Sequence, residues 1–120
     1  GSRSMPILTV RTNIGCDKIP SDLTQKLTCL ISTITGKPQS YVCVSICSCD
    51  KMMFGGTGAP CAYIEFKNLG SLPHRSDMTK KVMDLMSSSL DIEGDRMFLH
   101  FESILAENLG YDGKTFSGGK

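Results

Sequence analysis

The sequence predicts an α+β domain in which a tandem βαβ repeat forms a four-stranded mixed sheet with two helices on one face. The length of 120 residues suits one domain, and 40% hydrophobic residues suffice for a core. A strand–helix–strand pattern occurs twice with the same spacing, 35 residues from Ile7 to Val42 and 35 from Ala62 to Met97. Two such units side by side place both helices on one face of a shared sheet. We expect residues 1–4 to be an expression-tag remnant, 5–116 the domain, and 117–120 a flexible tail.

The first unit begins with a strand over residues 6–11. Proline is tolerated at its first position because that position needs no hydrogen-bond donor. A helix capped by Ser21 or Asp22 follows and ends at Gly36. Its apolar residues recur at helical spacing: Leu23, Leu27, Leu30, Ile31 and Ile34. Alternation over residues 41–46 then predicts the second strand.

The second unit repeats this order, with strands expected over residues 61–66 and 97–101. The helix between them is expected to be capped by Ser76 or Asp77. Its apolar stripe consists of Met78, Val82, Leu85, Met86 and Leu90. Glycines and apolar residues after residue 103 indicate a short hairpin or arm.

One face of the predicted sheet has no helix to cover it. This face is expected to carry a set of mostly apolar side chains: Leu8, Tyr41, Cys43, Tyr63 and Phe98. Such a surface is too apolar to remain exposed to water. We therefore expect a second copy of the chain to cover it in an oligomer.

The six cysteines do not form two paired CxxC halves, so no metal site is expected. We expect Cys29, Cys43 and Cys61 to be small buried hydrophobic residues in a reducing compartment. A net charge of +1 gives no reason to expect nucleic-acid binding. No apolar run approaches the roughly 20 residues of a membrane span, and no secretory signal is visible.

Four features are candidates for chemistry, and each has a structural alternative. If Met5 is the initiator and is removed, Pro6 offers a secondary amine as a base; otherwise it only starts a strand. Lys37 either holds an anionic substrate group or stabilises the helix end. His100 is either a hydrogen-bond donor to substrate or a packed side chain, and residues 54–58 form a turn or, less in keeping with their pattern, a phosphate loop.

A set of short motifs appears in a fixed order along nearly the whole chain, from Met5 to Phe116. The set comprises Met5-Pro6, Thr12-Asn13, Thr35-Gly36-Lys37-Pro38 with Tyr41, Phe54-Gly55-Gly56, Pro60-Cys61-Ala62, Asp95-Arg96 and the segment from Gly110 to Phe116. In that order it resembles the macrophage migration inhibitory factor family of the tautomerase superfamily. The resemblance implies a homotrimer and keto–enol tautomerase activity toward phenylpyruvate-like and dopachrome-like compounds, without a cofactor.

The resemblance also implies roles for individual residues. Pro6 matches the catalytic base, and Lys37 matches the lysine that binds the substrate carboxylate. Leu69 matches a residue whose backbone lines the pocket. Phe98 and His100 match a tyrosine and an asparagine supplied by the neighbouring subunit. The hydrophobic mouth of the pocket is matched by Leu109, Tyr111 and Phe116.

Departures from the family pattern and alternatives to the enzyme accompany the resemblance. Phe98 lacks the tyrosine hydroxyl, and the family's CxxC is broken because Ile64 replaces its second cysteine. The family also implies a cytokine-like signal that binds a cell-surface receptor, present in the cytoplasm and secreted without a signal peptide. Alternatives to the enzyme are therefore a receptor-binding cytokine mimic with a vestigial pocket, or an inactive oligomeric domain.

Overall fold

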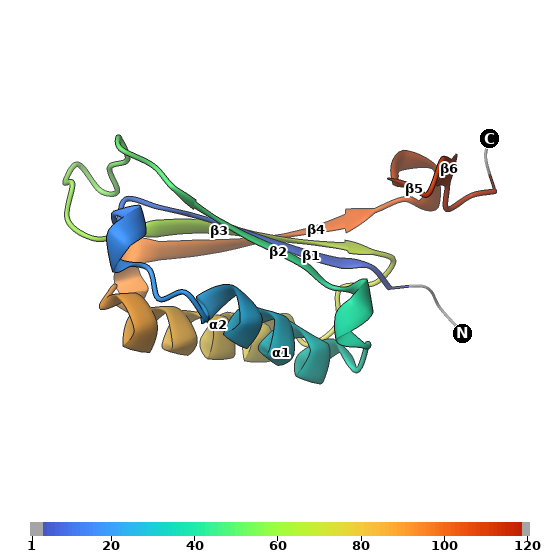
Figure 1. Ribbon diagram of the computed structural model, residues 1–120, viewed down its shortest axis with the longest axis horizontal. Helices are drawn as coiled ribbons and strands as arrows, with labels where there is room; N and C mark the ends of the chain where they lie inside the picture. The colour runs from blue at the N-terminus through green and yellow to red at the C-terminus, as the bar shows by residue number, and fades with distance from the viewer. Residues whose placement is uncertain (1–3, 119–120) are drawn as a thin grey trace.

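A computed structural model describes residues 4–118 and contains the predicted four-stranded sheet with two helices on one face (Figure 1). The expected tag and tail therefore lie partly outside the described residues, at positions 1–3 and 119–120. The sheet order is β2-β1-β3-β4. Its strands are β1 (Pro6–Thr12), β2 (Cys43–Ser48), β3 (Ala62–Leu69) and β4 (Met97–Ile104).

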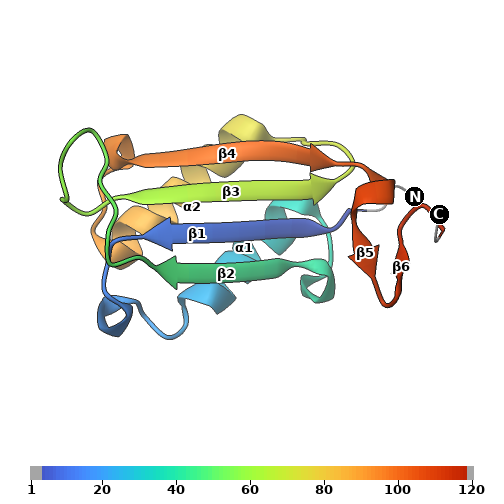
Figure 2. The same cartoon turned by 90° about the horizontal axis from the view of Figure 1, so that it is seen from above.

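The two βαβ units meet at the centre of the sheet. Strand β1 runs parallel to β2, and β3 runs parallel to β4. The central pair β1 and β3 is antiparallel, with Pro6 opposite Asn68 and Arg11 opposite Tyr63 (Figure 2). The mixed sheet predicted from the repeat is thus confirmed.

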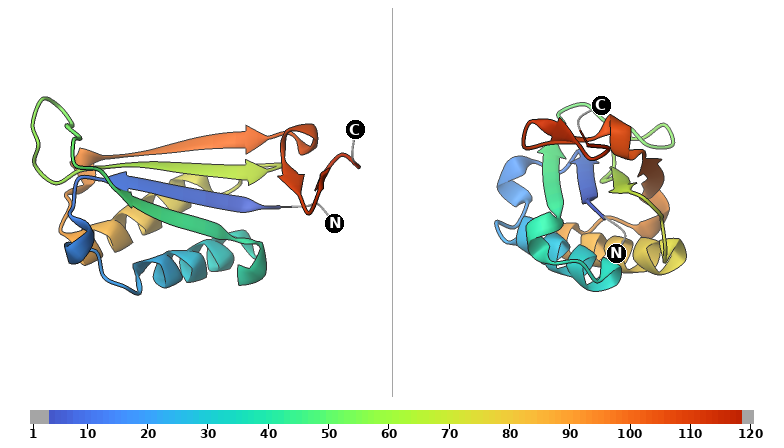
Figure 3. Two further views of the ribbon diagram at one scale, coloured as in Figure 1. Left: turned by 45° about the horizontal axis from the view of Figure 1, so that its top comes forward. Right: turned by 90° about the vertical axis from the view of Figure 1, so that its right-hand side faces the viewer.

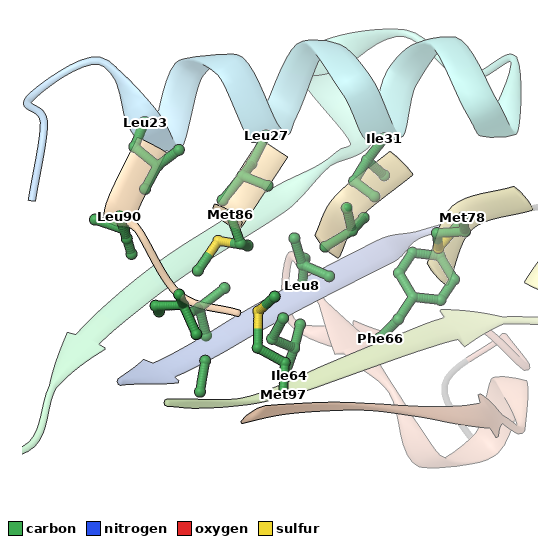
Figure 4. Close-up of a cluster of buried hydrophobic side chains, with 14 residues drawn as sticks. Leu8, Leu23, Leu27, Ile31, Ile64, Phe66, Met78, Met86, Leu90 and Met97 are labelled. Carbon is green, nitrogen blue, oxygen red and sulfur yellow. The ribbon is translucent and has the colours of Figure 1, made fainter. Parts of the chain in front are cut away.

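Helices α1 (Leu23–Thr35) and α2 (Arg75–Leu90) lie against the same face of the sheet. The core between the layers is continuous, with α1 contributing Leu23, Leu27 and Ile31 (Figure 4). From the sheet, Leu8 and Phe66 are at most 1% exposed. Burial of these stripes is the main force that holds the layers together.

The starts of both helices differ from the prediction. Helix α1 ends as expected at Gly36, whose φ of 72° is the left-handed conformation that glycine adopts without strain. Asp22 is at the N-cap position of α1, but its side chain makes no capping hydrogen bond. Helix α2 starts earlier than expected: His74, not Ser76 or Asp77, is its N-cap, with a φ of 59°.

Three predictions about burial and strand limits were wrong. Leu8 is 0% exposed and packs under the helices, because its side chain lies with that of Val10 on the helix-covered face of the sheet. Cys29 and Cys43 are exposed, on the outer side of α1 and on the edge strand β2, whereas Cys61 is buried as expected. The second strand starts at Cys43, because Tyr41 belongs to a short 3-10 turn, Gln39–Tyr41.

The C-terminal segment forms the expected hairpin, with strands β5 (Gly110–Tyr111) and β6 (Lys114–Thr115). This hairpin extends past the end of the sheet where the chain begins (Figure 3). At the opposite end, a loop crosses between β2 and β3. There Phe54 and Thr57 bridge a tight turn in which Gly55 and Gly56 have φ of 62° and 82°, which confirms a turn at this glycine cluster.

Candidate functional site

A hollow of about 490 Å³ lies at the sheet end that carries Pro6. It is lined by Ser4, Met5, Ser40, Tyr41, Tyr111 and Phe116. The last two side chains stack with ring centroids 5.8 Å apart and an interplanar angle of 18°. Met5 lines this hollow and immediately precedes Pro6, which is not itself among the lining residues.

Pro6 is held rigidly by its position in the sheet. It is the first residue of β1, its side chain is buried, and it pairs with Asn68 of β3. Asn68 is 3% exposed, and its amide donates to the carbonyl of Ser71 at 2.8 Å. Its Oδ1 accepts a hydrogen bond from the Ser4 hydroxyl at 2.9 Å, so a residue preceding Pro6 is tied to the site.

Two other residues predicted for this pocket, Leu69 and Lys37, lie on neighbouring elements but do not line the hollow. Leu69 ends β3 next to Asn68 and is 3% exposed. Lys37 is half-buried and follows α1, where its carbonyl accepts from the Ser32 hydroxyl at 2.5 Å. It stands just before the 3-10 turn that brings Ser40 and Tyr41 to the hollow.

The tail residues are fixed by the hairpin. Leu109 is half-buried and its carbonyl accepts the backbone N–H of Phe116 at 3.1 Å, which closes the segment that carries Tyr111. The structure thus brings Tyr111 and Phe116 to the hollow next to Met5-Pro6. Tyr41 and Ser40 were not predicted as site residues, although Tyr41 belongs to the motif that suggested the family.

Phe98 and His100 lie elsewhere in the same chain. Phe98 is opposite Tyr63, which is itself opposite Arg11, five positions along β1 from Pro6. At about 3.3 Å per residue this is about 17 Å along the strand. The side chain of Phe98 is 62% exposed and contacts Phe54 at 4.8 Å between ring centroids. Within one chain, therefore, Phe98 does not meet Pro6.

His100 likewise belongs to the helix-free face, whereas the Pro6 side chain shares the covered face with Leu8. The Nδ1 atom of His100 is 2.9 Å from the Tyr63 hydroxyl, and Nε2 is 3.9 Å from the Glu102 carboxylate. Sequence reasoning did not single out Tyr63 as a partner of His100. The parallel register, in which Tyr63 is opposite Phe98, would have been needed to find it.

Two charged groups complete this face. Arg11 donates to the Glu65 carboxylate at 2.7 Å, across β1 and β3. This hydrogen bond is the main cause that lowers the pKa of Glu65, with Lys67 and His100 adding smaller effects in the same direction. Among residues 4–118, no group of three or more His, Cys, Asp or Glu side chains is arranged to hold a metal ion.

The fold and the site define a class of protein: a tandem βαβ domain with a proline at the first strand position beside an apolar hollow. The model of the family named macrophage migration inhibitory factor matches residues 5–117. The chain belongs to the macrophage migration inhibitory factor family. Proteins of this family are members of the tautomerase superfamily.

Individual relatives agree with the family model over their full length. The macrophage migration inhibitory factor of Xenopus laevis is 32% identical over 115 residues, which cover 94% of this chain and 100% of the relative. The homolog from Trichinella spiralis is 35% identical over 114 residues, with 93% and 100% covered.

Solved structures show the same fold. The Trichinella spiralis factor superposes with a TM-score of 0.85 at 34% identity, covering 92% of this chain and 99% of that one. A homologue from Prochlorococcus marinus gives a TM-score of 0.83 at 26% identity, covering 92% and 98%. In the part of the chain that the structure describes, neither helix is long and apolar enough to cross a membrane.

Proposed function

We propose that this chain, once processed to begin at Pro6, is a cofactor-independent keto–enol tautomerase for aromatic keto compounds of the phenylpyruvate and dopachrome type. The observation that carries the proposal is the position of Pro6. It starts a buried strand next to a hollow lined by Tyr41, Tyr111 and Phe116. Membership of the family supports an isomerase of this class.

In this mechanism the neutral Pro6 nitrogen takes a proton from the carbon next to the substrate carbonyl. It then returns a proton to the oxygen of the resulting enolate, so the product is the enol isomer and nothing is consumed. Apolar surroundings disfavour the cationic amine, so the nitrogen stays unprotonated and can accept a proton near neutral pH. Tyr111 and Phe116 exclude water from the reacting atoms.

In the proposed complex, Lys37 binds the carboxylate of the substrate. His100 of the neighbouring subunit binds an oxygen of the substrate. Both contacts orient the substrate against Pro6 and do not form covalent bonds. Leu69 and Leu109 shape the wall and mouth of the same pocket. Phe98 of the neighbouring subunit contributes a ring but no hydroxyl.

Processing is central to the proposal, because the Pro6 nitrogen is an amide with no basic lone pair while residues 1–5 precede it. The hydrogen bond from Ser4 to Asn68 also holds Ser4 beside the site. The experiment compares the chain beginning at Gly1 with a chain beginning at Pro6, each verified by intact mass, in a phenylpyruvate tautomerisation assay. We expect activity only from the chain beginning at Pro6.

The loss of a positioned base corresponds to a difference of about 10²- to 10⁴-fold in rate. Equal activity of the two chains would refute Pro6 as the base. An inactive chain beginning at Pro6, with its assembly intact, would refute the enzyme itself and leave the inactive oligomeric domain.

The proposed assembly is a homotrimer in which each pocket receives Phe98 and His100 from a neighbour. The separation of these residues from Pro6 within one chain supports it, as does the 62% exposure of Phe98. Light scattering after gel filtration at micromolar concentration should give three times the chain mass, and a monomer would refute this assembly.

A mixing experiment tests the shared pocket. Trimers of the chain beginning at Gly1 lack the base, because their Pro6 nitrogen is an amide. Trimers of chains that begin at Pro6 and carry Phe98→Ala and His100→Ala lack the neighbour's contribution. After unfolding and refolding together in equal amounts, about a quarter of the pockets should combine an intact Pro6 with an intact neighbour. Activity above the sum of the separate proteins is expected, and its absence would place the whole pocket within one chain.

A second function is a signal that binds a cell-surface receptor, in which the chain is cytoplasmic and is secreted by a route that needs no signal peptide. The names of the relatives, inhibitory factors of macrophage migration, support it. Receptor binding by the chain beginning at Pro6 and by its Pro6→Gly variant would show whether signalling needs the pocket. Binding by neither protein would refute this function.

A further inference from the structure

His100 lies between two groups of different hydrogen-bonding chemistry on the helix-free face. The Tyr63 hydroxyl of β3 is 2.9 Å from its Nδ1 atom. The Glu102 carboxylate of β4 is on the other side, 3.9 Å from its Nε2 atom. The two rings of Tyr63 and His100 are tilted, with centroids 6.5 Å apart, so the contact is made through the hydroxyl and not by stacking.

These neighbours favour one tautomer of the neutral imidazole. A phenol hydroxyl donates readily to an unprotonated ring nitrogen, which places the lone pair on Nδ1. An ionised carboxylate can only accept, so it favours a hydrogen on Nε2. Both sides therefore favour the form with hydrogen on Nε2 and with Nδ1 as acceptor.

The hydrogen on Nε2 is not used in a hydrogen bond to Glu102. A separation of 3.9 Å is too long for a hydrogen bond to Glu102, so the Nε2–H group can donate to another acceptor. Glu65, opposite His100 in the sheet, uses one carboxylate oxygen to accept from Arg11 at 2.7 Å. Lys67 is the remaining charged group on this stretch of β3, and it carries no acceptor.

Phe98 makes this donor more important. In register Phe98 is opposite Tyr63, and its ring offers no hydroxyl. The phenol hydroxyl in this part of the sheet is therefore that of Tyr63 on β3, and it forms a hydrogen bond with the imidazole of His100. His100 is then the group on this strand that can donate from a ring nitrogen to a substrate oxygen.

We propose that Tyr63 is a positioning residue that holds His100 as a neutral Nε2–H donor to an oxygen of an aromatic keto substrate bound in the neighbouring subunit's pocket. The inference rests on the proposed tautomerase function. It assigns Tyr63 an effect through His100 and no contact with the substrate. Fixing the tautomer lets His100 act as a donor without first being protonated.

The first experiment measures the tautomer directly by long-range ¹H–¹⁵N NMR of the imidazoles. The chain has two histidines, so His74 serves as an internal reference. We expect an unprotonated Nδ1 and a protonated Nε2 for His100 at neutral pH. The Tyr63→Phe variant should shift the Nδ1 resonance and mix the tautomers. Ser88→Ala, which removes an exposed hydroxyl from α2 on the opposite side of the sheet, should leave His100 unchanged.

The second experiment measures kinetics on chains beginning at Pro6. Tyr63→Phe should raise KM about two- to tenfold, the range of one net hydrogen bond, and change kcat less. In a His100→Asn background the donor is an amide that needs no tautomer control, so Tyr63→Phe should then have no effect on KM.

The outcomes separate the proposal from the function on which it rests. A hydrogen on Nδ1 in the unsubstituted protein, or a tautomer indifferent to Tyr63→Phe, would overturn the positioning role whatever the activity. An equal effect of Tyr63→Phe on KM with His100 and with His100→Asn would show a merely structural role for Tyr63. That result would also overturn the positioning role. A protein without any tautomerase activity but with the expected tautomer would overturn the proposed function, and with it the substrate contact of His100.

Discussion

The two faces of the sheet are formed by the same strands but place their side chains in different environments. On the covered face Leu8 and Phe66 are at most 1% exposed and pack against both helices. On the helix-free face of the same strands, Arg11, Glu65 and Tyr63 are partly exposed and make polar contacts across strands. Because successive side chains in a strand point to opposite faces, adjacent positions fall into different environments.

This difference separates stability from chemistry. Substitutions on the covered face should change the free energy of unfolding, because they remove buried apolar contacts. Substitutions on the helix-free face should change assembly, substrate binding or pH dependence and leave the subunit folded. Neighbouring residues of one strand can therefore be used as matched pairs to test the division.

The largest effect is expected for Phe66→Ala on the covered face. Phe66 is 1% exposed, and its ring meets Phe101 edge-on with centroids 5.9 Å apart. Truncation leaves a cavity between sheet and helices, which costs about 3–5 kcal/mol. Denaturant unfolding at one fixed protein concentration measures the loss, since oligomerisation makes stability depend on concentration.

The matched control is Lys67→Ala, the next residue of β3, which is half-buried on the other face. Its free energy of unfolding should change by no more than about 0.5 kcal/mol. Equal losses for the two variants would show that the division between the faces does not hold.

Much of the fold could be predicted from the sequence, because the core follows regular periodicities. The stripe that contains Leu23, Leu27 and Ile31 is buried as its helical spacing indicates. The equal spacing of the two units correctly predicted the mixed sheet. Leu8 was misplaced because Ile7 and Leu8 are both apolar, so alternation alone did not reveal which of them faces the helices.

The candidate site was harder to predict, because it depends on distances between strands. Motif order identified Pro6, Tyr111 and Phe116, and the structure brings the last two to one hollow beside Met5. The Tyr63–His100 contact depends on the register of β3 against β4, which no local pattern encodes. The start of α2 was also missed, since His74 adopts a left-handed φ that the sequence does not signal.

An intermediate effect is expected for Thr12→Val, which tests a polar exception on the covered face. Thr12 is 0% exposed, and its hydroxyl donates to the Cys61 carbonyl at 2.8 Å. The same hydroxyl accepts the backbone N–H of Ile14 at 3.2 Å. Valine keeps the shape but removes both contacts in a buried place, which should cost about 1–3 kcal/mol.

Thr9→Val is the control for this change, because Thr9 lies on the helix-free face of the same strand and is only half-buried. Thermal or denaturant unfolding should show a smaller change for Thr9→Val than for Thr12→Val. A neutral Thr12→Val would mean that water or relaxation replaces the lost hydrogen bonds.

The smallest effect is expected for Glu65→Gln on the helix-free face. The hydrogen bond from Arg11 lowers the pKa of Glu65, so the folded protein binds this proton less tightly than the unfolded chain does. The resulting stabilisation is complete above the ordinary glutamate pKa of about 4.3 and is lost as pH falls through the lowered pKa of the folded state. The pair is partly exposed, with 46% and 19% of the Arg11 and Glu65 side chains accessible, so solvent and salt weaken it.

Unfolding curves of the unsubstituted protein and Glu65→Gln, recorded from pH 7 down to pH 3, test this expectation. The difference between them should be small and constant near neutrality and should shrink in acid, since the other carboxylates titrate alike in both proteins. Added salt should reduce the difference at pH 7, because partly exposed charges are screened. A difference that grows in acid would show that Glu65 is stabilised in its protonated form, and the Arg11–Glu65 contact would then not be the main interaction of this carboxylate.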